Sequence, residues 1–120
     1  MAAPNIVNVA TIQGQTASGT LTTSNSAWVT CGAEYVVKVN SIIVANIDGT
    51  NTATATVYFY NSGGGVRHQI IHQVPVPPGT SWKVMDKHSA IYLEEGDKIE
   101  GMASAGSDLT MIVSYDAITD

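Results

Sequence analysis

The sequence predicts an all-β fold, a single antiparallel β-sandwich of about eight strands with no significant helix. Stretches rich in Val, Ile, Thr and aromatic residues recur roughly every ten residues, separated by turn signals. Several of them alternate apolar and polar side chains with the period of a strand that has one face on a core. No stretch has the apolar spacing of an amphipathic helix. A jelly roll and an immunoglobulin-like sandwich both fit this pattern.

The length and composition fit one packed domain. A chain of 120 residues buries about two-thirds of the surface that its unfolded form exposes. We expect an extended N-terminal arm at residues 1–5 and a single β-sandwich domain at residues 6–120. The apolar fraction of 44% excludes a disordered chain. Only 12% of the residues are charged, fewer than a free, highly soluble monomer usually carries, so something else is expected to cover part of the surface.

Charge and cysteine content narrow the partners and the compartment. The net charge is −5 and the cations are scattered, which disfavours nucleic acid and anionic membranes as partners. Cys31 is the single cysteine, so we expect a small buried side chain in a fold without an intramolecular disulfide. The first residues lack the pattern of a signal peptide, and no run approaches the roughly 20 apolar residues of a membrane span. We therefore expect folding in a reducing cytoplasm.

The N-terminal quarter gives weak strand signals. Pro4 blocks both helix and ladder hydrogen bonds in the expected arm, and residues 6–12 alternate like a first strand. Residues 13–26 are rich in Gly, Ser, Thr and Gln, with a weak strand pattern at residues 19–23. They form either a surface loop or an edge strand that is kept polar to discourage edge pairing. A short strand is expected at residues 27–31.

Residues 35–60 have the strongest strand pattern in the chain. Residues 35–47 and 52–60 are dense in β-branched and aromatic residues, and the second stretch alternates cleanly between a small apolar face and a Thr and Tyr face. The first stretch carries apolar side chains on both faces, as in a central strand or a subunit contact. Asp48 and Gly49 between them tolerate positive φ, so the sequence predicts one long β-hairpin.

The rest of the chain continues with strands and turns. A Gly-rich turn at residues 61–65 precedes a strand that Pro75 and the following prolines end at a sheet edge. Turns are expected at residues 94–97 and 106–108, and the strand after the first of them is expected to pair back from it. The strands expected in this half are residues 66–76, 81–86, 90–93, 98–105 and 109–115.

Several groups of side chains have some resemblance to reactive or metal-binding sites. His68 and His72 lie four residues apart, as in a zinc-binding helix, but on a strand they are about 13 Å apart, too far for one ion. The acidic turns at residues 48–51 and 94–97 offer oxygen ligands without the spacing of a calcium loop, so a structural calcium ion is left open there. No nucleophile–base pair, carboxylate pair or phosphate loop is recognisable. The sequence predicts neither a catalytic site nor a cofactor.

Aromatic residues and the N-terminal arm are the interface candidates. Tyr58 and Tyr60 share the Thr face of their strand, and Trp28 and Trp82 lie on short strands. Exposed aromatic rings can stack on sugars, as in carbohydrate-binding modules, or anchor a protein interface, whereas core packing is the default for each tryptophan. The residues expected at an interface are Pro4, Asn5, Ile6, Trp28, Thr54, Thr56, Tyr58, Tyr60 and Trp82.

Several segments together resemble one group of proteins. In chain order they are residues 39–50 (VNSIIVANIDGT), 74–79 (VPVPPG), 91–97 (IYLEEGD), 107–109 (SDL) and 113–115 (VSY). Their combination, spread over most of the chain, resembles the small virion structural proteins of tailed bacteriophages, particularly those of marine and cyanobacterial hosts. The LEEGD turn alone recurs in many jelly rolls, whereas the combination does not.

The resemblance implies an all-β module that assembles on a phage particle without chemistry, and it carries over no catalytic or ligand residues. Capsid decoration (cement) proteins of this size sit on the outer shell as small oligomers and staple neighbouring capsomers. The implied partners are the protein itself, as a homo-oligomer and expected trimer, and the phage major capsid protein. The implied location is the virion, after assembly in the host cytoplasm. A neck, tail or fibre-attachment protein is one alternative, and a glycan-binding β-sandwich module is another.

Overall fold

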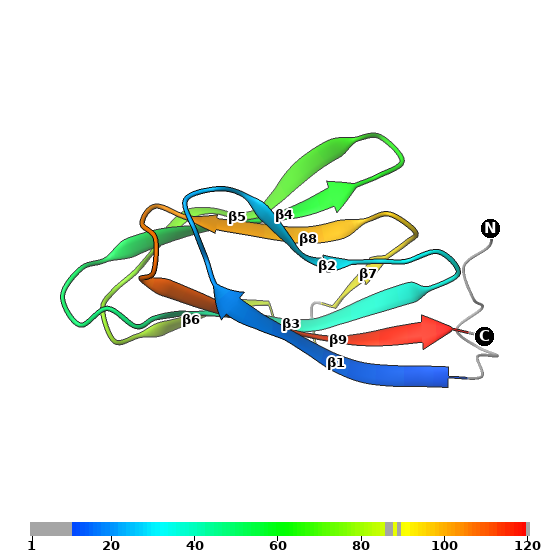
Figure 1. The fold of residues 1–120 in the computed structure, drawn as a ribbon, viewed down its shortest axis with the longest axis horizontal. Coiled ribbons are helices and arrows are strands. Elements are labelled where there is room, and N and C mark those ends of the chain that lie inside the picture. Colours follow the sequence, from blue (N-terminus) through cyan, green and yellow to red (C-terminus); the bar gives the residue numbers. More distant parts are fainter. Residues whose placement is uncertain (1–10, 86–87, 89, 120) are drawn as a thin grey trace.

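Nine strands in two packed sheets account for most of the chain. The computed structural model describes residues 11–85, 88 and 90–119, and these contain strands and no α-helix (Figure 1). The predicted antiparallel β-sandwich is therefore confirmed. The strands are β1 (Thr11–Thr20), β2 (Ser26–Thr30), β3 (Val36–Asn46), β4 (Ala53–Asn61), β5 (Val66–Val76), β6 (Ser81–Met85), β7 (Ile91–Leu93), β8 (Lys98–Ala103) and β9 (Leu109–Thr119).

The strand order is that of a jelly roll. The 5-stranded sheet has the order β1-β9-β3-β6, with β7 also pairing β3, and the 4-stranded sheet has the order β2-β8-β4-β5. The first strand thus pairs with the last, β2 with β8, β3 with β6 and β7, and β4 with β5, all antiparallel. The chain is one long hairpin rolled into two sheets, which is the jelly-roll arrangement rather than the immunoglobulin one.

The predicted long hairpin has the right strands but the wrong pairing. β3 and β4 lie in different sheets, so the connection at residues 47–52 crosses from one sheet to the other. Side-chain oxygens shape this connection: Asn46 Oδ1 accepts the Asp48 N–H at 2.8 Å, and Asp48 Oδ1 accepts the Thr50 N–H at 2.9 Å. Gly49 does not adopt the positive φ of a tight hairpin turn. The alternation of apolar and polar residues in β4 predicted which of its side chains face inwards, but not which strands pair with it.

The strand pairing also tests two other sequence predictions. The strand after the turn at residues 94–97 does not pair back, because β7 joins β3 while β8 joins β2 and β4. Of the polar residues 13–26, residues 13–20 belong to an edge strand, β1, whereas residues 21–25 form the connection to β2. The predicted strand at residues 6–12 is described only from Thr11 onwards, and the predicted arm at residues 1–5 lies outside the described residues.

The core lies between the two sheets and is filled by the inward-facing residues of both. Ala53, Ala55 and Val57 of β4 point inwards as predicted. Cys31 is buried at 1% exposure, also as predicted, and its Sγ lies 3.2 Å from the Tyr35 carbonyl oxygen. The largest fully buried side chains are Leu21, Ile42, Leu93, Ile99, Leu109 and Met111.

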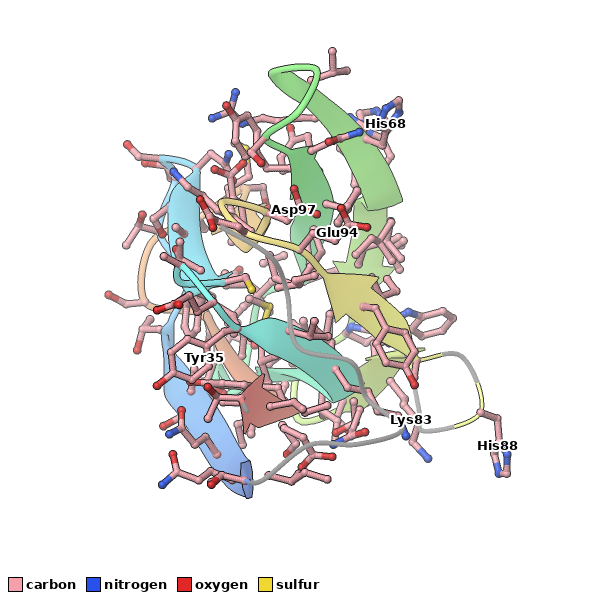
Figure 2. All side chains as sticks on the ribbon, turned by 90° about the vertical axis from the view of Figure 1, so that its right-hand side faces the viewer. Tyr35, His68, Lys83, His88, Glu94 and Asp97 are labelled. Atoms are coloured by element: carbon pink, nitrogen blue, oxygen red, sulfur yellow. The ribbon has the colours of Figure 1, made fainter. Side chains whose placement is uncertain are left out.

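Asp97 joins three connections at one end of the sandwich. Its buried carboxylate accepts the Ser62 N–H at 3.0 Å, the Ser62 hydroxyl at 3.1 Å and the Glu94 N–H at 3.1 Å. Its backbone carbonyl accepts the Cys31 N–H at 3.0 Å, and Gly96 N–H donates to the Cys31 carbonyl at 2.9 Å. Figure 2 looks onto this end and shows Glu94 and Asp97 on the turn between the sheets. The turn thus ties β4–β5 and β2–β3 together.

Gly96 is expected to tolerate no side chain. Its φ is +86°, and a Cβ placed there would lie 2.8 Å from Ser62 Oγ, which is itself held by hydrogen bonds to the Glu95 carbonyl and Asp97. We predict that Gly96→Ala lowers the free energy of unfolding by about 2–3 kcal/mol, measured by urea denaturation. Gly106→Ala is the matched control, because no atom lies within 4 Å of its Cβ position. Equal losses in the two variants would contradict this prediction.

Candidate interaction surfaces

The predicted interface residues fall in separate places. Pro4, Asn5 and Ile6 lie outside the described residues. Trp82 is 46% exposed on the edge strand β6, whereas Trp28 is half-buried on β2 and packs against the core. These tryptophans border different sheets, so the structure does not bring them together in one groove.

The Thr and Tyr face of β4 forms part of the outer surface of the 4-stranded sheet. Thr54, Tyr58 and Tyr60 are half-buried there. Thr56 is only 6% exposed, and its hydroxyl oxygen accepts the Gln73 N–H at 3.1 Å. The two tyrosines therefore offer a partner more surface on this face than Thr56 does.

An ion pair between a half-exposed arginine and a buried glutamate lies beside these tyrosines. The Glu100 side chain on β8 is 5% exposed, and Arg67 on β5 donates to its two oxygens from Nε at 2.6 Å and from Nη2 at 3.3 Å. Asn25 Nδ2 donates a third hydrogen bond at 3.0 Å. The Tyr60 ring lies between two cations, with Arg67 Cζ 4.9 Å and Lys98 Nζ 5.3 Å from its centroid. We call these five residues the sheet-face cluster.

The ion pair fixes the charge of the sheet-face cluster at neutral pH. Burial by itself would raise the pKa of Glu100, but hydrogen bonds from Arg67 and Asn25 outweigh it and hold the pKa below its usual value. The same hydrogen bond with Glu100 raises the pKa of Arg67. Sequence reasoning found Tyr60 and missed Arg67 and Glu100, which lie 33 residues apart. One sequence feature could have pointed to this pair: Glu100 lies within a strand, where glutamate is depleted.

The most exposed strand is β1, at the edge of the 5-stranded sheet. It pairs with β9 over ten residues, from Thr11 opposite Thr119 to Thr20 opposite Thr110, without a register shift. The strand contains no charged residue and no proline. Its outer face carries Ile12, which is 59% exposed. Such an edge presents a row of unpaired backbone groups to which another strand can bind.

A small groove lies between the β1 and β2 edges. Its volume is about 270 Å³, and neutral amide, hydroxyl and phenol groups line much of it. Gln13 and Gln15 of β1 line it next to Tyr115, which pairs with Gln15 from the neighbouring strand β9, and Tyr35 contributes from the connection between β2 and β3. Figure 2 shows Tyr35 on this side of the sandwich, near β1 and β2. The lining residues are Gln13, Gln15, Thr30, Gly32, Tyr35, Val37, Tyr115 and Ala117.

Potential metal ligands remain dispersed. In residues 11–85, 88 and 90–119, no three His, Cys, Asp or Glu side chains gather in a way that could hold a metal ion. His68 and His72 lie on strand β5, and Figure 2 shows His68 well apart from Glu94 and Asp97. Both oxygens of the Asp97 carboxylate accept backbone N–H groups.

Among residues 11–85, 88 and 90–119, the structure has no helix of sufficient length and hydropathy to cross a membrane.

Comparisons with known proteins identify a shared fold. No protein-family model matches the sequence, and no curated protein matches it. A solved structure described under the words "Bacillus endospore appendages form a novel family of disulfide-linked pili" matches with a TM-score of 0.52 and 12% sequence identity. The match covers 91% of this chain and 87% of that chain. At this identity the likeness establishes a common fold over nearly the whole chain.

Proposed function

We propose that this protein is a structural subunit of a virus particle, a capsid decoration protein of a tailed phage that binds the outer shell and stabilises contacts between capsomers. The observation that carries the proposal is the β1 edge, ten uncharged residues that pair on one side with β9 and, among the described strands, with no other strand. The proposed partners are further copies of the protein, in a homo-oligomer, and the major capsid protein. The proposed role is non-enzymatic and its location is the virion.

The fold is consistent with this role. Jelly rolls are common in viral capsid domains, although a fold alone does not fix a function. The Bacillus appendages that share the fold are also assembled structures. They are disulfide-linked, whereas Cys31 of this chain is buried, and burial raises the pKa of its thiol. The proposed assembly therefore relies on non-covalent contacts.

Binding to phage shells tests the proposal. Purified protein is mixed with shells of a tailed cyanobacterial phage that lack their decoration protein, and the pelleted shells are assayed for bound protein and for the temperature at which they rupture. Saturable binding together with a higher rupture temperature is expected. Binding to tails or necks but not to shells would instead identify a neck, tail or fibre-attachment protein. Binding to none of these parts would contradict a virion role.

The homo-oligomer is tested separately by size-exclusion chromatography with light scattering. The trimer expected from the resemblance would place the protein on a threefold position of the shell. The N-terminal arm is tested with a variant that lacks residues 2–5, which is expected to bind shells more weakly if the arm extends onto a neighbour. Unchanged binding would exclude that role of the arm.

A glycan-binding module is the second candidate, and the groove between β1 and β2 is the observation that favours it. Two tyrosines and two glutamines line the groove, and sugars are recognised by aromatic stacking and neutral hydrogen-bonding groups. A panel of glycans titrated into the protein tests this function by tyrosine and tryptophan fluorescence. A response that Tyr115→Ala abolishes would support it, and an unchanged signal across the panel would count against it.

A further inference from the structure

The strands at the sheet edges differ in how well they are protected against pairing with another chain. β2 has five residues and a register shift, and β6 has five residues, a register shift in its pairing and Lys83. β7 has three residues. β5 is long, but it has register shifts, Pro75, and Gln73 at a φ of +47°. These are the devices that block edge-to-edge pairing, and β1 has none of them.

We propose that β1 pairs with β1 of a second copy of the chain, antiparallel and about a twofold axis, so that the two 5-stranded sheets join into one. This inference rests on the proposed function, because it names the surface through which the structural subunit associates with itself. It replaces the trimer that the resemblance implies, since an isologous pair closes as a dimer. The two strands would add backbone hydrogen bonds along their length, as in other strand additions. The contact is isologous, since each copy presents the same strand.

Among the described edge strands, β1 of a second copy is the best pairing partner for β1, because each of the other edge strands is unsuitable. Pairing of β1 with β5 of another copy would meet the register shifts and Pro75, and β2, β6 and β7 are too short to cover ten residues. Each copy carries a net charge of −5, but β1 is uncharged, so self-pairing places no like charges opposite each other on the two strands. It would also partly cover Ile12, which is 59% exposed.

The twofold axis restricts the register of the pair. It must run perpendicular to the sheet, so the inner faces of both copies lie on the same side and residues directly opposite each other share a face. One residue near the middle of β1 then lies opposite its own copy. The longest overlaps place Gln15 opposite Gln15, beside the groove, or Thr16 opposite Thr16, on the outer face.

Disulfide crosslinking tests this register. Residues directly opposite in an antiparallel pair have Cα atoms about 4.5–5.5 Å apart, which suits a disulfide. Gln15→Cys or Thr16→Cys is therefore expected to give a covalent dimer under mild oxidation. Thr20→Cys is the matched control on the same strand, because its two copies would lie at least about 27 Å apart in either register. The unsubstituted protein, with Cys31 buried, gives the background.

The outcomes separate this inference from the proposed function. A yield of dimer from Gln15→Cys or Thr16→Cys about tenfold above that from Thr20→Cys supports the pairing. Equal yields from all three variants, or no dimer from any of them, overturn it. Protein that binds shells without the position-dependent crosslink contradicts the β1 pair alone, whereas protein that crosslinks but binds no phage part contradicts the virion role alone. A strict trimer in solution would also overturn the twofold pair.

A charge placed on the edge provides an independent test. Thr16→Lys puts a charge in the middle of β1, and we expect the dissociation constant of the dimer to rise about tenfold, since the two like charges then lie directly or diagonally opposite each other in either register. Ser81→Lys adds the same charge to the edge strand β6 and is expected to leave the dissociation constant within about twofold, because that edge lies outside the contact. Analytical ultracentrifugation at matched ionic strength measures both. Equal weakening by the two substitutions would overturn the pairing.

Discussion

Replacing Asp97 with alanine is expected to lower the free energy of unfolding by about 3 kcal/mol, the largest single loss that we predict. The substitution removes a buried carboxylate that accepts three hydrogen bonds, two from Ser62 and one from the Glu94 N–H. The N–H groups of Ser62 and Glu94 would then lose their acceptor in a part-buried site. Because the turn also pairs with the backbone of Cys31, the loss is expected to loosen both the β2–β3 and the β4–β5 connections.

Urea denaturation at neutral pH measures this loss, with Glu95→Ala as the control. Glu95 lies in the same turn, but its side chain is exposed, and it is its backbone carbonyl that accepts the hydrogen bond from Ser62. Glu95→Ala is expected to change the free energy of unfolding by less than about 0.5 kcal/mol. Asp97→Asn retains one side-chain acceptor oxygen, so an intermediate loss is expected. Similar values for the alanine variants at positions 95 and 97 would show that the carboxylate does not stabilise the fold.

Replacing Arg67 with methionine is expected to lower the free energy of unfolding by about 2 kcal/mol at pH 7. Methionine keeps much of the aliphatic contact of the side chain but leaves the Glu100 carboxylate, 5% exposed, with Asn25 as its remaining side-chain donor. The expected loss is below that for a fully buried pair because the Arg67 side chain is itself 49% exposed. Lys98→Met is the control, because it removes the other cation beside Tyr60 without removing a hydrogen bond to Glu100.

The pH dependence of the stability loss tests whether the unpaired Glu100 carboxylate causes it. In the unsubstituted protein its pKa is lowered on folding, so its stabilising contribution is present above the unfolded pKa, near 4.5, and is lost as the pH falls through the folded pKa. Without Arg67, burial is expected to dominate and raise the pKa, so the Glu100 contribution in the variant becomes destabilising as the pH rises above about 4.5. The stability difference between the two proteins should therefore shrink on acidification. A difference that stays constant from pH 7 to pH 4 would contradict this account.

Local alternation was sufficient to predict most of the strands after residue 26 and the inward face of β4, but not the extent of β1 or the sheets to which the strands belong. The Thr and Tyr face of β4 and the burial of Cys31 follow from the order of side chains along the chain. The hairpin prediction failed because a turn sequence such as Asp48-Gly49 also suits a connection between sheets, where Asn46 and Asp48 cap backbone N–H groups. In a jelly roll, neighbouring strands in sequence are often not neighbours in a sheet.

The interaction surfaces, too, were predictable only where they depend on a single strand. Tyr58 and Tyr60 were predictable as outward-facing residues because their strand alternates. The pairing of Arg67 with Glu100 depends on β5 and β8 both flanking β4, which is a property of sheet order and not of either strand alone. β1 was recognised only as a possible polar edge strand. Its lack of protection is evident only by comparison with the edges formed by β2, β5 and β6, and that comparison requires the topology.

The pairing of the first described strand with the last has a consequence for the newly made chain. β1 has β9 as its ladder partner, and β9 ends 99 residues after β1 does (Thr20 to Thr119). At a translation rate of about 5–20 residues per second, β1 waits about 5–20 s on the ribosome before its partner emerges. A strand with few large apolar side chains withstands that wait without aggregating, which gives a reason for its Gln, Ser, Thr and Gly composition. The edge proposed for self-association is therefore formed only when synthesis of the domain is nearly complete, so that subunits pair after they fold.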